Sequence, residues 1–273
     1  MELEHDLPKI RAQGFGLAAI SYDSVDVLKN FATRRGITFP LLSDPKSAII
    51  RSFGILNETV AKNSPAEGVP YPGTYIVDRA GIVTAKYFVD DFRERDTAAE
   101  ILVKQFGIRV EEARSSTETK FFQLSTAASN DLVHQGQHIS LVLDLDIKPG
   151  MHVYAPSIQG GYIPIDWKIA ASPGFKAGDV DYPKPRMLRL DAIHETVPAY
   201  VGHLRLTRDL IIGSDVQVKP LLGKDNELVV EGSLRYQVCD DRECFIPALQ
   251  PLRWVLHYEL LDRQRVPPEL QRK

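Results

Sequence analysis

Hydrophobic residues in the first hundred positions fall into short runs separated by amphipathic stretches. Residues 15–22 form a continuous apolar run, which is typical of a strand buried on both faces. A helix is predicted next, with Asp23 or Ser24 as its N-cap and Gly36 at its end. Residues 39–44 have the length and pattern of a second strand.

The same alternation continues to residue 107. Asp44, which stands directly before a proline, predicts the start of a second helix that ends at Gly54. Residues 73–89 predict two strands around a tight turn, and residues 97–107 predict a last helix that opens with a capping box. The order β-α-β-α-β-β-α indicates an α/β layer domain.

Beyond this region the pattern changes to period two. Residues 109–120 are polar and charged, as expected for an exposed linker. Apolar and polar positions then alternate in short segments with Gly and Pro turns, which predicts a β-sandwich. The predicted strands are 121–129, 138–147, 163–171, 204–212, 227–239 and 252–260. We therefore predict four segments: an α/β domain at 1–108, the linker at 109–120, an all-β domain at 121–262 and a tail at 263–273.

Composition and charge narrow the possible functions. The 273 residues are 44% hydrophobic and 25% charged, which is ordinary for two globular domains. The net charge of -3 gives no basic excess to attract nucleic acid, and no apolar run has the ~18 residues that a membrane span needs. No signal peptide is visible in the N-terminal residues. We expect no nucleic-acid partner, no membrane span and no cofactor, because no phosphate-binding loop or paired catalytic carboxylates are present.

Two segments of the first domain resemble a known family. "ISYDSVDVLKNFATRRGITFPLLSDPKSAIIRSFGILN" and "YPGTYIVDRAGIV" are similar to AhpC/TSA-type redoxins, which are peroxiredoxin relatives with a thioredoxin fold. The resemblance covers about residues 1–106. It implies that Pro72 holds the place of a proline, usually cis, that faces the reactive cysteine. Either isomer of the Tyr71–Pro72 bond stays open.

The attacking cysteine of that family is missing, because the first cysteine of this chain is Cys239. Residues 15–21 are therefore expected to form a strand that lacks its central parallel neighbour. A strand with such an exposed apolar edge favours aggregation. We expect a truncated product that lacks the first β-α unit and has no thiol peroxidase activity. The alternative is a redoxin domain that has lost its chemistry and serves as a scaffold.

The segment "YQVCDDRECFIP" carries a second resemblance. Together with "GMHVYAP" and "YVGHLRL", it is similar to the N-terminal periplasmic domain of the thiol:disulfide interchange protein DsbD, which is immunoglobulin-like. The resemblance covers about residues 118–262 and implies a redox-active pair, Cys239 and Cys244, that exchanges with a thioredoxin-like partner protein in an extracytoplasmic compartment. It implies supporting aromatics at Tyr236, Tyr200 and Phe245, with Tyr200 in the cap that shields the cysteines. Four residues separate the cysteines here, whereas some family members have five.

The chemistry of the cysteine pair can be considered independently of this resemblance. Antiparallel flanking strands would place Cys239 opposite Cys244, with Cα atoms about 4.5–5.5 Å apart and thus within reach of a disulfide. The six-residue loop would stabilise the fold by only about 2 kcal/mol. Asp240, Asp241 and Glu243 are expected to raise the thiol pKa values.

Three interpretations of the pair stay open: a redox-active pair, which we favour, a structural disulfide or free thiols, and two metal ligands. Metal is disfavoured because zinc needs two further ligands. His134 and His138 could form a metal pair only on a helix, and Gly136 between them indicates a turn. The sequence therefore predicts a thiol-disulfide oxidoreductase, and the alternative is a non-enzymatic binding or scaffold protein with a structural disulfide.

Overall fold

The computed structural model describes residues 2–64, 66–88, 93–108, 114–190, 194–261, 264 and 266–270. It divides into two compact units, residues 1–102 with 261–273 and residues 103–260, and the boundary lies inside one helix. No helix in the described part of the chain is long and apolar enough to cross a membrane.

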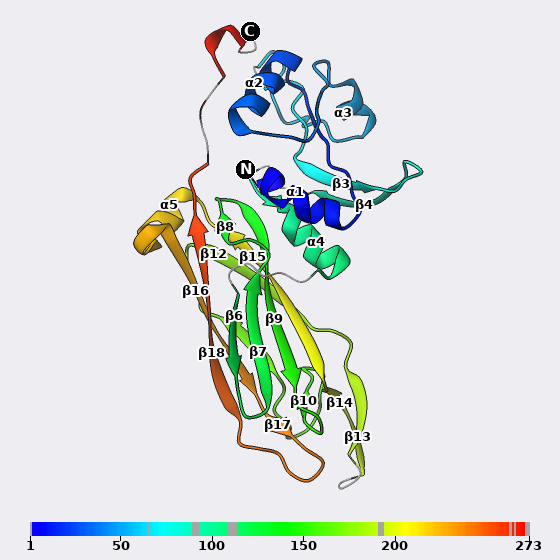
Figure 1. The fold of residues 1–273 in the computed structure, drawn as a ribbon, viewed down its shortest axis with the longest axis vertical. Coiled ribbons are helices and arrows are strands. Elements are labelled where there is room, and N and C mark those ends of the chain that lie inside the picture. Colours follow the sequence, from blue (N-terminus) through cyan, green and yellow to red (C-terminus); the bar gives the residue numbers. More distant parts are fainter. Residues whose placement is uncertain are drawn as a thin grey trace. The chain divides into compact units, whose positions relative to one another are not determined.

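The first unit combines helices with two small sheets (Figure 1). β1 pairs with β2 in parallel, and β3 pairs antiparallel with β4 in a separate sheet. Its elements are α1 (Glu2–Ala12), β1 (Ala19–Ser21), α2 (Val25–Arg35), β2 (Leu41–Ser43), α3 (Ala48–Ser52), β3 (Gly73–Val77), β4 (Val83–Phe88), β5 (Arg95–Asp96) and α4 (Ala98–Phe106). The predicted strands and helices from β1 to α4 are present in the predicted order, and α1 and β5 are two further elements that were not predicted.

Local capping explains where two of these helices begin. Ser24 is the N-cap of α2, since its hydroxyl accepts a hydrogen bond from the Val27 N–H, and Gly36 ends the helix at φ 63°. The predicted start of α3 at the proline is wrong, because the helix begins at Ala48. Asp44 still stabilises this helix, because its carboxylate accepts the N–H groups of Ala48 and Ile50 at 2.9 Å each.

The prediction that residues 15–22 are a strand buried on both faces is also wrong. β1 covers only Ala19–Ser21, and its three residues are half-buried. In the part of the chain that the structure describes, β2 is its one strand partner, so one edge of β1 has no neighbouring strand to cover it.

The second unit consists mainly of strands in three sheets (Figure 1). Its strands are β6 (Ser115–Glu118), β7 (Phe122–Ala128), β8 (Leu132–Val133), β9 (Gln137–Ile147), β10 (His152–Tyr154), β11 (Asp166–Ile169), β12 (Phe175–Asp181), β13 (Arg186–Leu190), β14 (Glu195–Tyr200), β15 (His203–Ile212), β16 (Glu227–Tyr236), β17 (Val238–Cys239) and β18 (Ala248–Tyr258). The strand orders are β12-β15-β9-β7-β6, β11-β16-β18-β8 and β13-β14-β10-β17. The short helices α5 (Asp215–Val218), η1 (Lys219–Leu221) and η2 (Lys224–Asn226) lie between β15 and β16, and η3 (Pro268–Leu270) belongs to the first unit.

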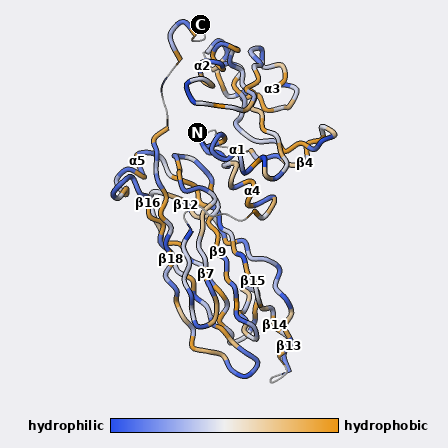
Figure 2. The backbone as a smooth tube through the Cα atoms, viewed as in Figure 1, coloured by the Kyte–Doolittle hydropathy of each residue, from blue (hydrophilic) through white to orange (hydrophobic). Residues whose placement is uncertain are grey.

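Alternating burial gives this unit its core. Hydrophobic and hydrophilic residues alternate along its strands in Figure 2, and on β9 Leu141, Leu143 and Leu145 are buried while Asp146 is exposed. Trp167 on β11 stacks on Trp254 on β18 with 5.7 Å between the ring centroids, and Trp254 reaches the Ala127 carbonyl on β7 of the six-stranded sheet. The predicted β-sandwich is confirmed.

The sequence pattern did not predict five strands of this unit, β8, β10, β12, β13 and β14, and it placed residues 115–118 in the linker. These residues form β6, which pairs with β7 although all four of its residues are exposed. Linker residues 109–113 and tail residues 263, 265 and 271–273 lie outside the described residues.

Candidate functional site

Cys239 and Cys244 form a disulfide across a tight antiparallel hairpin. The Asp240 N–H donates to the Glu243 carbonyl at 3.0 Å, and the Phe245 N–H donates to the Val238 carbonyl at 2.9 Å. These two bonds flank the cysteines, which are therefore a non-hydrogen-bonded pair, the closer of the two antiparallel pair types. The Cα atoms are 4.0 Å apart, which is shorter than the predicted 4.5–5.5 Å.

Asp240 organises the four-residue loop between the cysteines. Its Oδ1 accepts the N–H groups of Arg242 at 2.7 Å and Glu243 at 2.8 Å. The backbone hydrogen bonds from Glu243 and Arg242 lower the pKa of Asp240, because they stabilise the charged carboxylate. The loop is thus held in one conformation by an ionised side chain.

The two sulfur-bearing residues differ in exposure. Cys239 is 1% exposed and packs with Tyr154, Val197 and Ala199, whereas Cys244 is exposed. An incoming thiolate must reach a sulfur to open a disulfide. The structure therefore makes Cys244 the accessible end of the bond.

The strand β10 places two side chains beside the disulfide. It lies between β14 and β17, and His152 is the register partner of Cys239. Directly opposite residues share a face, and side chains two positions apart on a strand also share it. His152 and Tyr154 therefore lie on the face of Cys239.

Tyr154 contacts the exposed sulfur itself. Its hydroxyl lies 3.5 Å from Cys244 Sγ, while the residue is 1% exposed. Burial raises the pKa of Tyr154, and the Glu195 carboxylate adds to this effect, so the hydroxyl keeps its proton. Its ring packs at 4.7 Å between centroids on Tyr162, whose hydroxyl donates to Glu195 and has its pKa raised to about 12, mainly by that bond.

The predicted aromatic supports lie elsewhere. Tyr200 pairs with Val153, the residue between His152 and Tyr154, so it points to the opposite face of this sheet from Cys239. Its hydroxyl donates to the Pro183 carbonyl at 2.8 Å, and its ring belongs to the sandwich core. A cap over the disulfide built from Tyr200 is therefore not what the structure shows.

Tyr236 and Phe245 also pack into the sandwich. Tyr236 meets Phe122 edge to face with 4.8 Å between centroids, and Phe245 packs on Phe121 at 4.7 Å. The Lys120 ammonium lies 4.8 Å from the Phe245 ring centroid. These residues pack the two ends of the hairpin onto the core. Tyr154, which was not among the predicted site residues, makes the contact with the disulfide that was expected of the cap residue.

Pro72 precedes β3 in the first unit, whereas both cysteines belong to the second. The described residues include no cis peptide bond, so the Tyr71–Pro72 bond is trans. The role that the redoxin resemblance implies for Pro72, that of the proline facing a reactive cysteine, stays a prediction.

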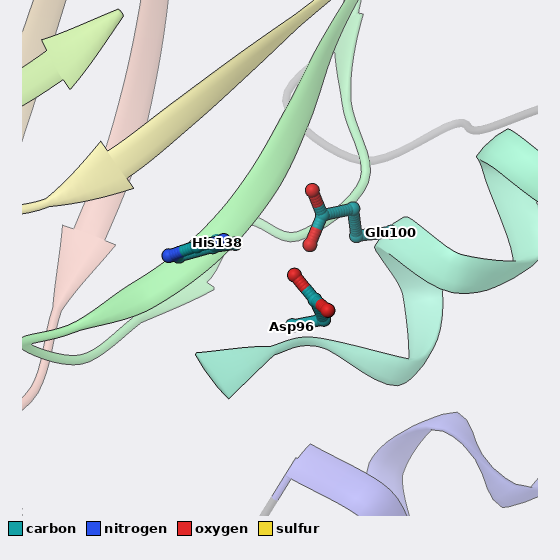
Figure 3. Close-up of side chains that lie close together, drawn as sticks. All are labelled: Asp96, Glu100 and His138. Carbon is teal, nitrogen blue, oxygen red and sulfur yellow. The ribbon is translucent and has the colours of Figure 1, made fainter. Parts of the chain in front are cut away.

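Among the described residues, one group of possible metal ligands is found outside the disulfide. Figure 3 shows its members, Asp96 on β5, Glu100 on α4 and His138 on β9. The two carboxylates belong to the first unit and the histidine to the second, so we assign no joint role to them. His134 and His138 flank a turn at Gly136, as predicted, and the His134 Nδ1 atom lies 2.7 Å from the Glu259 carbonyl oxygen.

Comparisons with known families agree with both resemblances. Residues 1–86 match the AhpC/TSA family, and residues 118–250, which include both cysteines, match the family described as thiol:disulfide interchange protein DsbD, N-terminal. The predicted combination of a redoxin-type segment and an immunoglobulin-like β-sandwich is confirmed.

Individual relatives cover parts of the chain. Alkyl hydroperoxide reductase E from Mycobacterium bovis and from Mycobacterium tuberculosis is 36% identical over 84 residues, 30% of this chain and 50% of the relative. The chain thus spans about half the length of these curated relatives. The N-terminal periplasmic domain of ScsB from Proteus mirabilis has a TM-score of 0.36 and 14% identity, covering 54% of this chain and 51% of that one. The reduced DsbD N-terminal domain of Neisseria meningitidis has a TM-score of 0.29 and 14% identity, covering 42% and 74%.

Proposed function

We propose that the chain is a thiol-disulfide oxidoreductase whose reactive group is the Cys239–Cys244 pair and whose partner is a thioredoxin-like protein. The observation that carries this proposal is the unequal exposure of a disulfide that closes only a short loop. The match of residues 118–250 to the DsbD N-terminal family supports the choice of partner.

A purely structural role would gain little from this bond. Its cysteines are five positions apart, and the loop-entropy relation gives such a ring about 2 kcal/mol of stabilisation. The hairpin is already fixed by backbone hydrogen bonds on both sides of the cysteines and by the Asp240 carboxylate. The bond therefore adds little order that the chain does not already have.

Exchange with a dithiol partner follows from the accessible sulfur. A partner thiolate attacks Cys244 Sγ, the Cys239–Cys244 bond breaks, and Cys239 leaves as a thiolate that takes up a proton. The second partner thiolate then attacks the partner sulfur of the mixed disulfide, and Cys244 leaves. Two electrons pass to this chain, and the reverse sequence returns them.

Both cysteines of the chain lie in the second unit, so we propose that this chain does not reduce hydroperoxides. Turnover of a hydroperoxide with thioredoxin or dithiothreitol, above that of a variant with both cysteines replaced by serine, would contradict this.

The rival function is a binding or scaffold protein with a structural disulfide, which the burial of Cys239 favours.

The reduction potential of the pair separates the two functions. Equilibration with glutathione or dithiothreitol buffers, followed by thiol counting, should give a value above about -300 mV. A value below this, together with no exchange with a thioredoxin-like protein, would make the bond structural.

A further inference from the structure

The residue opposite Cys239 on the neighbouring strand is a histidine with an unused nitrogen. His152 is 2% exposed, and its buried Nε2 atom has no hydrogen-bond partner among the described residues. Buried polar atoms are nearly always paired, and an exception calls for an explanation. An aromatic ring without nitrogen would fill the same space at a lower cost of desolvation.

The surroundings of His152 relate it to the cysteine loop. Cys239 is its register partner, and directly opposite residues have Cβ atoms about 4.5–5.5 Å apart. Asp241 and Asp240 act on its charge from the loop, and Tyr154 packs at 5.2 Å between ring centroids from its own strand. These positions place the His152 ring on the same face of the sheet as Cys239, and Nε2 makes no hydrogen bond to the cysteine sulfur while the disulfide is formed.

A small cavity of about 240 Å³ opens beside this position. Its lining includes His152, Asp241 and Lys148 with the apolar side chains Met151, Leu188 and Val201. Lys148 is engaged by Glu118, whose carboxylate lies 3.6 Å from its ammonium. The titratable groups near His152 are therefore Asp240 and Asp241, which act on its charge, Lys148, which lines the same cavity, and Tyr154, which packs on its ring.

We infer that His152 is the proton acceptor for the Cys239 thiol when the reduced pair passes its electrons to an oxidised partner. The inference deepens the proposed function, on which it rests. Cys244, the exposed thiol, attacks first as its thiolate, the disulfide of the partner breaks, and the first partner sulfur leaves as a thiolate. Cys239 then gives its proton to Nε2 and attacks Cys244 Sγ, which forms the intramolecular bond and expels the second partner sulfur.

The charge state of His152 suits it to accept the proton of the Cys239 thiol. Burial lowers its pKa, although Asp241 and Asp240 oppose the effect, so the imidazole is ready to take up a proton at neutral pH. Once protonated, the imidazolium faces the Cys239 thiolate, and a neighbouring opposite charge lowers a thiol pKa by about 1–3 units. The buried thiol thus becomes a nucleophile without contact with bulk water.

The test uses oxidised glutathione as the disulfide substrate. The reduced full-length chain is mixed with it, and the decay of the glutathione adduct is followed by acid quench and mass spectrometry. His152→Phe keeps an aromatic ring of similar size and removes the nitrogen. His257→Phe, which replaces an exposed histidine on β18, is the matched control.

We expect the resolving step of His152→Phe to be about tenfold slower at pH 7, with its pH profile moved up by about one unit, because the thiol loses its neighbouring cation. The His257→Phe variant should resolve the adduct at the wild-type rate. A folded His152→Phe variant whose resolving rate lies within twofold of wild type would overturn the inference. Glutathione replaces the protein partner, so failure of the proposed function, seen as lack of exchange with a thioredoxin-like protein, is distinguishable from failure here.

A measurement on the wild-type chain covers the case in which His152→Phe does not fold. The imidazole resonance of His152 should show a second inflection with pH, at the thiol pKa, in the reduced chain and not in the oxidised chain. A resonance that titrates identically in both states would show that His152 does not face the thiol.

Discussion

The two units of this chain differ in how deeply they bury their strands. In the first unit β1 pairs with β2 and β3 pairs with β4 in two-stranded sheets, and β1 is half-buried. In the second, longer strands pack around a core that holds both tryptophans of the chain, and Cys239 is buried in a smaller cluster beside Tyr154. The cysteine pair therefore lies on the unit whose backbone hydrogen bonds and Asp240 carboxylate already hold the hairpin.

The largest expected effect on this comparison comes from the tryptophan stack. Trp254 is 1% exposed, and its Nε1 donates to the Ala127 carbonyl at 3.0 Å. Trp254→Ala should lower the free energy of unfolding of the second unit by about 3–5 kcal/mol. Denaturant unfolding followed by the fluorescence of Trp167 measures this unit alone, because the first unit has no tryptophan.

Ile50→Ala is the matched change in the first unit, since Ile50 is 1% exposed on α3. It should leave the fluorescence transition of the second unit unchanged. A shift equal to that of Trp254→Ala would show that the two units unfold as one, and the contrast between them would fail.

Removal of the disulfide should have a smaller effect on stability. Cys239→Ser or Cys244→Ser is expected to lower the free energy of unfolding of the second unit by about 2 kcal/mol or less, because the closed loop is short. The same fluorescence transition measures it. Outright unfolding of the sandwich in either variant would make the bond a structural staple.

Tyr154→Phe should slow disulfide exchange by about two- to tenfold. The change removes the hydroxyl that lies 3.5 Å from Cys244 Sγ, and one hydrogen bond contributes about 0.5–1.5 kcal/mol. Without it the Cys244 thiolate is less stable, so the first attack on oxidised glutathione becomes slower. Tyr162→Phe is the control, because the Tyr162 hydroxyl bonds to Glu195. An equal decrease of the exchange rate in both variants would show that the contact between the Tyr154 hydroxyl and Cys244 Sγ has no role in exchange.

The smallest expected effect is the loosening of the cysteine loop at low pH. The folded pKa of Asp240 is lowered, so its contribution is present above the ordinary value of 3.8 and is lost as the pH falls through the folded value. Amide hydrogen exchange of Arg242 and Glu243 should therefore accelerate, relative to the intrinsic rate, below about pH 4. In Asp240→Asn the same amides should show no such acid step, and an unchanged step would assign it to another group.

Much of the fold could be predicted because it depends on local pattern. The alternation along β9 places Leu141, Leu143 and Leu145 in the core, and four residues between two cysteines on antiparallel strands make them opposite neighbours. Ser24 and Gly36 similarly define α2 through local hydrogen bonds and a left-handed residue. Each of these features depends only on residues a few positions away in the sequence.

The surroundings of the disulfide could not be predicted in the same way. Whether Tyr200 or Tyr154 faces Cys239 depends on the register in which β10 pairs with β14 and β17, and a shift of one residue exchanges the two faces. His152 and Tyr154 share a face because they are two positions apart on β10, and only the long-range pairing of that strand shows which face it is. The burial of β1 was likewise misjudged because it depends on neighbouring strands and not on its own residues.

The account rests on Cys244 being the sulfur that partners reach, and trapping tests this most directly. In Cys239→Ser the resolving thiol of this chain is absent, and the partner is a thioredoxin-like protein with its second active-site cysteine replaced by serine and its first linked to thionitrobenzoate. Attack by Cys244 then expels thionitrobenzoate, and a mixed disulfide at Cys244 should accumulate and be identified by peptide mass spectrometry. In Cys244→Ser the buried Cys239 should give little or none, because it is 1% exposed. Equal trapping at Cys239, or no trapping in either variant, would contradict the account.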